Sequence, residues 1–499
     1  MRPRWGRASQ RSSPKRAEGR NGAPWKRSGS GRKTAIEVAL DRACSVAVDV
    51  GCLDWGAHCR RAGSKPARID AKVAAMSLFK TLRSAASPVL HTAEGLLKSG
   101  EKAVITAEHG LQNLVKKAEH AAVGLAQDVF DQVRTLHVTG KFQSVPSAQL
   151  KLKADFHEAT QVEALTQSGA FQKVSLGELP LDRSYVAGSD RGPDAAIPNT
   201  GMHNQSPTGF TFNPEDQQTS KWMPQAVTTS AESDPQTGMV DGKKWVAVTW
   251  HSDDGKRSRL SLVDTTNPDD PAARQYRNVE LMIPDAKNPG KLVPLASHVG
   301  GVSWVGSHLY VAQTGGGVRV FDVNQLLKVN DASKVPSGTE PYVLPQVGYY
   351  RTQAAPGEKA HAGEGSAPIF SGLSVDRTQA EPALLSQEYD AAHPGGRIVR
   401  WPIDPATGLL KEKDGVVQAT DAWSVPLARL AGIVRLKDGF QVATMGSPSG
   451  LWTMKPGETP QRKDSLAQGI QQFSYDSLQN QIWTVAEHPG KRMVWAFDP

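Results

Sequence analysis

The residues best suited to chemistry are one histidine, three glutamines and two glutamates in the C-terminal two thirds of the chain. Each stands near the start or the end of a short apolar run, and together they are His298, Gln225, Gln346, Gln471, Glu388 and Glu487. A histidine titrates near neutral pH, so His298 can act as a ligand or as a general base. Several carboxylate oxygens around one point can hold a hard cation such as Ca²⁺.

Two interpretations of these six residues stay open at the sequence level. In the first they line a common funnel, and convergence of His298, Glu388 and Glu487 would support a metal-assisted hydrolase or lyase. In the second the histidine and the glutamines bond to neighbouring strands, and the glutamates are solvated charges at strand ends. We predict no metal and no cofactor, with Ca²⁺ at the funnel as the one alternative, and no catalytic residue can be assigned.

Familiar catalytic and binding motifs are missing from the sequence. No Gly-x-Ser-x-Gly, His-Glu-x-x-His or dinucleotide-binding pattern occurs. The acidic turns at 252–255 and 264–271 lack the spaced ligands and the closing carboxylate of a calcium loop. The sequence therefore leaves open whether the protein is an enzyme, and it favours a protein that is not.

The elements that must position these residues are short strands, and residues 297–322 contain the clearest set. Three apolar runs, at 299–304, 309–312 and 318–321, are separated by short turns. The second turn contains three glycines, which adopt positive φ without a Cβ clash. Three short strands joined by tight turns form a meander, and a recurring meander indicates a β-propeller.

The unit recurs from residue 221 onward. Strand starts with small residues lie at 224–229, 297–302, 370–375, 430–434 and 468–473. Apolar runs that close a unit lie at 260–264, 318–322, 399–404, 450–455 and 493–498. Five starts and five ends predict five blades, and the long interval from 322 to 404 leaves room for a sixth blade or for a loop inserted over 329–368. Equivalent places in successive sheets are expected for Trp304, Trp401, Trp452 and Trp495.

The positive net charge of +8 belongs to residues 1–75, which form a basic tail. This tail holds 17 Lys and Arg against 6 Asp and Glu, which leaves 41 against 44 for the other residues. We expect the tail to be disordered, or to result from a start codon placed before Met76, or to act as a basic arm. The remaining chain has no charge pattern for nucleic acid. All three cysteines lie in the tail, so the rest of the chain uses no disulfide.

Residues 76–140 are predicted to be an amphipathic helical region, because apolar residues recur there at spacings of three and four. This face packs within the protein or on another copy, or it contacts a membrane surface through residues 77–138. Residues 141–220 are predicted to be linker and loops with a short helix within 148–165, and residues 221–499 to be the propeller. No apolar run is long enough for a transmembrane helix.

Several motifs between residues 224 and 444 occur together in one family. They include Pro-Gln at 224–225, His-Val-Gly-Gly-Val-Ser-Trp at 298–304, Leu-Tyr-Val-Ala at 309–312, Val-Phe-Asp-Val at 320–323 and Ser-Val-Asp-Arg at 374–377. With these motifs the chain resembles uncharacterised secreted β-propeller-like proteins that are common in actinobacteria. The resemblance implies a propeller and export, and it implies no known reaction. The amphipathic region stands where that family has a secretion signal, so the sequence does not indicate the export route.

The sequence thus predicts a mainly β protein, a five-bladed or six-bladed propeller that follows a helical region. We expect an exported, non-catalytic module that binds a protein or a glycan, with delivery as a virulence effector as one use. The alternative is a metal-dependent hydrolase or lyase that acts at the axial funnel. Strand starts made mostly of Gly, Ala, Ser and Gln favour binding over catalysis.

Overall fold

The computed structural model describes residues 138, 140–188, 208–353, 360–446 and 449–499. The chain divides into two compact units, residues 1–126 and 127–499, and every described residue belongs to the second unit. The predicted basic tail and nearly all of the predicted helical region at 76–140 lie outside the described residues. Among the residues that are described, no helix has the length and hydropathy needed to cross a membrane.

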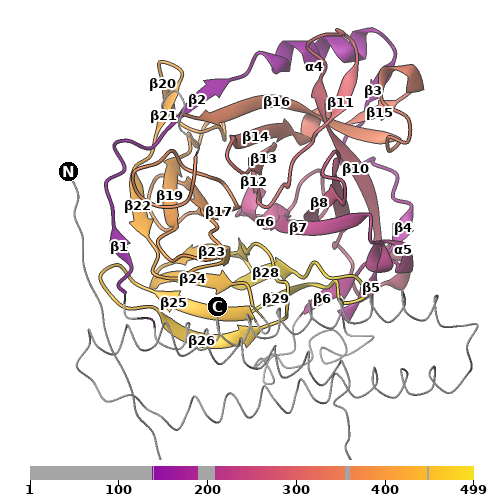
Figure 1. Ribbon diagram of the computed structural model, residues 1–499. Coiled ribbons are helices and arrows are strands. Elements are labelled where there is room, and N and C mark those ends of the chain that lie inside the picture. Colours follow the sequence, from indigo (N-terminus) through magenta and orange to yellow (C-terminus); the bar gives the residue numbers. More distant parts are fainter. Residues whose placement is uncertain (1–137, 139, 189–207, 354–359, 447–448) are drawn as a thin grey trace, which may run out of the picture. The chain divides into compact units, whose positions relative to one another are not determined.

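The described part of the chain is mainly β and contains several sheets, which confirms the mainly β part of the predicted fold class (Figure 1). Most strands fall into five runs of four antiparallel strands, here called runs 1 to 5. Run 1 is β7 (Trp222–Thr229), β8 (Trp245–Ser252), β9 (Ser258–Asp264) and β10 (Gln275–Pro284). Run 2 is β12 (Val302–Val305), β13 (His308–Gln313), β14 (Gly317–Asp322) and β16 (Tyr342–Thr352).

The other three runs follow in chain order. Run 3 is β17 (Gly372–Asp376), β18 (Ala383–Gln387), β19 (Arg397–Pro402) and β22 (Asp421–Ser424). Run 4 is β23 (Leu430–Leu436), β24 (Gly439–Thr444), β25 (Ser449–Met454) and β26 (Gln461–Leu466). Run 5 is β27 (Ser474–Asp476), β28 (Gln481–Val485), β29 (Val494–Phe497) and β6 (Thr208–Thr211), whose last strand comes from before run 1.

The meander predicted over 297–322 is present as β12, β13 and β14. Gly306 has a φ of +56° in the turn between β12 and β13, a conformation that favours glycine. A short parallel pairing of β10 with β16 joins runs 1 and 2 into one continuous sheet.

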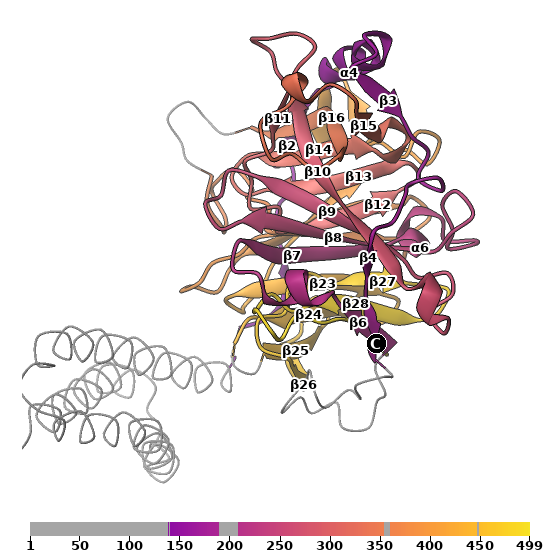
Figure 2. The same ribbon diagram turned by 90° about the vertical axis from the view of Figure 1, so that its right-hand side faces the viewer.

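The first strands of the five runs lie side by side. They contact one another in the order β7, β12, β17, β23 and β27, and β27 contacts β7 again. Strand β6 pairs with β29. Run 5 is therefore built from a strand that precedes run 1 in the sequence and three strands that follow run 4. Figure 1 shows the runs arranged around α6, and Figure 2 shows their edges from the side.

Apolar side chains are buried between successive runs rather than in a single core. Five buried clusters lie in turn between runs 1 and 2, 2 and 3, 3 and 4, 4 and 5, and 5 and 1. The cluster between runs 5 and 1, for example, brings Phe210 and Val494 against Val227 and Trp250. Burial of these surfaces is the main force that holds one run against the next.

Residues 140–188 pass along the outer edges of four runs, and we call this segment the belt. Its strands are β1 (Gln143–Ser144), β2 (Lys151–Asp155), β3 (Phe171–Lys173), β4 (Arg183–Ser184) and β5 (Val186–Ala187), with helix α4 (Glu158–Gln167) between β2 and β3. The belt strands pair in order with β22, β16, β15 (Leu327–Val329), β10 and β6. Covering edge strands in this way removes unpaired backbone groups that promote aggregation. The predicted short helix at 148–165 thus corresponds to β2 followed by α4.

Of the four tryptophans that were expected in equivalent places, three occupy them. Trp401, Trp452 and Trp495 lie on the third strands of runs 3, 4 and 5, whereas Trp304 lies on the first strand of run 2. The indole N–H groups of Trp401 and Trp452 each donate to a hydroxyl on the neighbouring second strand, Ser386 and Thr444 respectively. Trp304 therefore packs differently from the other three.

Helix α6 (Ser230–Ser233) follows β7 and contacts the first strands β12 and β27. It carries Glu232, which is buried and accepts hydrogen bonds from the Thr228 hydroxyl at 2.8 Å and from the Tyr475 backbone N–H at 3.3 Å. Desolvation raises the pKa of Glu232 from 4.5 to about 7. The buried carboxyl is therefore protonated in the folded protein over a pH range where it is ionised in the unfolded chain.

Glu232 should make stability depend on pH. The folded protein favours the protonated form of Glu232. The contribution of this group to the free energy of unfolding is therefore fully present below pH 4.5 and is lost as pH rises to about 7. We expect Glu232→Gln to gain stability relative to the wild type between pH 5 and pH 8, by on the order of 2–3 kcal/mol. Urea unfolding at several pH values measures this difference, with Glu364→Gln, an exposed residue, as control. A difference that stays constant with pH would contradict the assignment.

Candidate functional site

His298 lies in the loop that leads into β12, next to a second histidine that the sequence analysis did not identify. His251, in β8, has its ring centre 4.8 Å from that of His298, and the two rings are tilted by 33°. Nδ1 of His251 lies 2.8 Å from the Ser252 carbonyl oxygen, which fixes the orientation of that ring. Desolvation, followed by the nearby His251, lowers the pKa of His298 to about 4. His298 is exposed and His251 is half-buried.

The backbone next to His298 is strained. Val299 has a φ of +49°, which is rare for a β-branched residue. Its carbonyl oxygen accepts a hydrogen bond of 2.9 Å from the Thr249 hydroxyl on β8, and its side chain is fully buried. Strain of this kind persists where the surroundings fix a particular arrangement, often at a functional site. Here the Thr249 hydrogen bond holds the residue next to His298 against run 1.

Two of the predicted residues, Gln225 and Glu487, contact one another. The buried Gln225 amide donates to a Glu487 oxygen at 3.1 Å and to the Pro224 carbonyl oxygen at 3.0 Å. Gln225 lies in the middle of β7 in run 1, and Glu487 follows β28 in run 5, so this hydrogen bond joins the two runs. Glu487 is half-buried.

Glu388 is fully buried and is enclosed by donors. Its carboxylate pairs with the Arg397 guanidinium through contacts of 2.9 and 2.6 Å. Backbone N–H groups of Gly363, Ile369 and Arg397 donate to the same two oxygens. This saturated ion pair ties the loop before β17 to β19, and it leaves no lone pair directed at solvent.

Gln346 and Gln471 lie in different surroundings from one another. Gln346 is buried within β16, the last strand of run 2, where its amide donates to Glu158 at 2.9 Å and its oxygen accepts from Arg319. Gln471 is nearly buried just before β27, and its carbonyl oxygen accepts from the Thr484 hydroxyl. The structure therefore joins Gln225 with Glu487 and places Gln346 with the belt.

Gln472, the residue after Gln471, forms hydrogen bonds with the first strands of two other runs. Its oxygen accepts from the Val302 backbone N–H at 2.5 Å, and its amide donates to the carbonyl oxygens of Val302 and, at 3.2 Å, Val227. The side chain is completely buried and links the first strands of runs 1 and 2 to the segment that begins run 5. The sequence around Gln472 contains no feature that distinguishes it from the adjacent Gln471, so it was not predicted.

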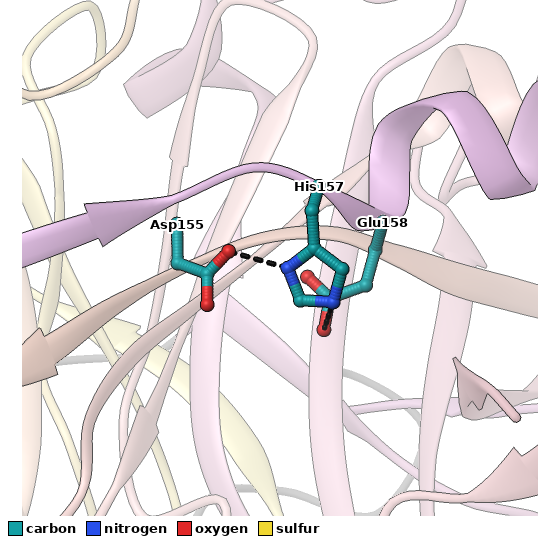
Figure 3. A group of neighbouring side chains, drawn as sticks. All are labelled: Asp155, His157 and Glu158. Carbon is teal, nitrogen blue, oxygen red and sulfur yellow. Dashed lines mark hydrogen bonds and ion pairs between the residues drawn. The ribbon is translucent and has the colours of Figure 1, made fainter. Parts of the chain in front are cut away.

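A further group of side chains lies on the belt. Asp155 ends β2, His157 precedes α4, and Glu158 is the first residue of α4 (Figure 3). Each offers a ligand atom, and these atoms all lie within 4.8 Å of one another. The Asp155 carboxylate contacts Nδ1 of His157 and raises its pKa, and Nε2 of His157 lies 3.9 Å from Glu158. The sequence indicated a linker at these positions, so this group was not among the predicted site residues.

Comparison with known proteins identifies no family. No family model matches the chain, and no curated protein matches it. Among solved structures, a structural genomics protein of unknown function from Bacteroides thetaiotaomicron resembles it at a TM-score of 0.28 and 10% sequence identity. That match covers 55% of this chain and 69% of the other.

Proposed function

We propose that residues 208–499 form a five-bladed β-propeller, with one blade for each of runs 1 to 5. Support comes from the cyclic contacts of the five first strands and from the five apolar clusters between successive runs. Strand β6 then closes the ring by pairing with β29, as an antiparallel edge strand that precedes the first blade. The interval from 322 to 404 contains the last strand of run 2 and the first strands of run 3, which favours five blades over six.

We further propose that this propeller is an exported, non-catalytic module that binds a protein or a glycan partner. The observation that carries the proposal is the His251–His298 pair, two adjacent rings of which one is exposed, beside the strained Val299. Neutral imidazole rings offer flat surface for stacking together with a donor and an acceptor nitrogen. Gln225, within the first strand of run 1, and Glu487, just after the second strand of run 5, add a second polar pair that joins two runs.

The hydrolase alternative receives less support from the same residues. It requires a carboxylate that is free to bind a metal or to move a proton. Both oxygens of Glu388 instead accept hydrogen bonds from Arg397 and from backbone N–H groups. A general base near neutral pH is also poorly matched to His298, whose pKa is lowered to about 4. Of the two glutamates considered for such a site, Glu388 is fully buried and Glu487 is half-buried.

The binding proposal is tested with the full-length protein, a panel of glycans and candidate partner proteins from the producing culture. We expect the His251→Ala/His298→Ala double variant to bind any retained partner at least tenfold more weakly than the wild type. His157→Ala, on the belt, serves as the matched control and should bind as the wild type does. Equal binding by all three proteins would refute the proposed surface, and release of glycan products would favour the hydrolase. Fractionation of the culture tests export.

A further inference from the structure

The strongest unassigned feature of the molecule is the belt group of Asp155, His157 and Glu158. These three residues lie within four positions, and they converge because β2 ends at Asp155 and α4 begins at Glu158. Their ligand atoms lie within 4.8 Å of one another, and Figure 3 shows the Glu158 carboxylate against the imidazole ring of His157. Exposure differs among them: His157 is exposed, Asp155 is half-buried, and Glu158 is buried.

One oxygen of Glu158 is the observation that points to a ligand. Glu158 is 6% exposed, and its Oε1 accepts the Gln346 amide at 2.9 Å. Its Oε2 is buried and has no hydrogen-bond partner. A buried carboxylate oxygen without a partner loses its hydration and gains nothing in return. A cation among the three side chains would satisfy this oxygen.

The donor set indicates which cation fits. One imidazole nitrogen and two carboxylate oxygens suit Zn²⁺ and chemically similar divalent ions, which bind such groups at about 2.0–2.2 Å. Ca²⁺ prefers six to eight oxygen ligands, and this group offers too few. We propose that Asp155, His157 and Glu158 form a site for Zn²⁺ or a similar transition-metal ion, with solvent completing the coordination on the exposed side.

Neighbouring charges oppose tight binding. The Arg351 guanidinium lies 3.3 Å from the second Asp155 oxygen, and Arg319 contacts Gln346 on the far side of Glu158. The N-terminus of α4 also carries a partial positive charge. Arg351 is half exposed and can swing away into solvent, whereas Arg319 is held by Gln313 and Tyr349. We therefore expect a dissociation constant on the order of micromolar rather than nanomolar.

Binding would also change the contact between Asp155 and His157. The Asp155 carboxylate is hydrogen-bonded to Nδ1 of His157, and since an ionised carboxylate only accepts, Nδ1 then carries the proton. A metal ligand must be deprotonated, so the ion competes with this proton and affinity falls at low pH. The ion would fix the turn that carries the belt from β2 into α4, next to β16.

The test uses untagged, full-length protein that has been freed of metal by a chelator. Zn²⁺ is titrated by calorimetry, and Co²⁺ is added separately to give a visible absorption spectrum. We expect the wild type to bind one more ion than either His157→Gln or Glu158→Gln, or to bind the ion at least tenfold more tightly than either variant does. His393→Gln is the matched control, because His393 is exposed and faces Asp390 at 3.5 Å without a third ligand.

Each outcome decides for or against the site. The cysteines of residues 1–75 are the same in every variant, so any binding there cancels in the comparison. Equal stoichiometry and affinity in the wild type and His157→Gln would overturn the proposal and leave solvent as the partner of Oε2. His157 is exposed, so its variant remains informative even if Glu158→Gln fails to fold. Partner binding by the His251–His298 pair is a separate measurement, so either proposal can fail alone.

Discussion

Glu388→Gln should lower the free energy of unfolding by about 3–5 kcal/mol, because it leaves a buried guanidinium without its counter-charge. Glu388 and Arg397 are both nearly inaccessible to solvent, and two contacts of 2.9 and 2.6 Å join them. The amide of glutamine would also present a donor to backbone N–H groups of Gly363 and Ile369 that now donate to the carboxylate. Urea denaturation, followed by tryptophan fluorescence, measures the change.

Two comparisons make this result specific. Glu381 and Lys411 form an exposed pair at 3.0 Å, and Glu381→Gln should change stability by less than about 1 kcal/mol. The double variant Glu388→Gln/Arg397→Gln removes both charges and keeps a carbonyl acceptor for the backbone N–H groups, so it should recover part of the loss. If Glu388→Gln proved as stable as the wild type, the glutamate would be free for chemistry and the hydrolase alternative would gain support.

Gln472→Leu should have the second large effect, a loss of about 3 kcal/mol or more. Leucine has a similar volume, but it cannot accept from the Val302 N–H or donate to the carbonyl oxygens of Val302 and Val227. Each buried backbone group that loses its partner costs about 1–3 kcal/mol. Thermal unfolding of the variant and the wild type measures the loss.

The control for this substitution is Gln479→Leu, an exposed glutamine in the turn after β27. Its stability should stay within about 0.5 kcal/mol of the wild type. A Gln472→Leu variant that unfolds at the wild-type temperature would show that the first strands do not depend on this side chain.

The sequence predicted the inner strands of the fold well. The five predicted starts correspond to the first strands of runs 1 to 5 or to the residues directly before them, and the five predicted ends correspond to their third strands. These strands are buried on both faces, so their apolar residues and the glycine turns between them form a strong local pattern. The predicted mainly β class is confirmed, while the number of blades remains our proposal.

The outer strands could not be predicted in the same way. Strand β26 reads Gln-Arg-Lys-Asp-Ser-Leu and is mostly exposed, so it has no apolar alternation. Strand β6 has four residues and lies in a stretch that predicts loop, since its partner β29 is far away in sequence. The belt strands contain two to five residues, too few for a periodicity to appear. Pairing between distant segments determines these strands.

Predictions for single residues were limited by partners that lie far away in the sequence. His298 was identified from its place before a strand, but its contact with His251 depends on the packing of run 1 against run 2. His251 is the second-last residue of the second strand of run 1, and this place near a strand end was the one local signal for it. The pairing of Glu388 with Arg397, nine positions later, follows from a hairpin whose register the sequence did not reveal.

The pairing of β6 with β29 has a consequence for biosynthesis. Val494 lies opposite Phe210, so one of these partners leaves the ribosome long before the other. During translation the edge of β6 that pairs with β29 stays open while runs 1 to 4 are made, and Phe210 remains available to chaperones or to other nascent chains. The protein should therefore mature in a late, single step, and a brief delay before residues 494–497 emerge would keep the whole assembly open.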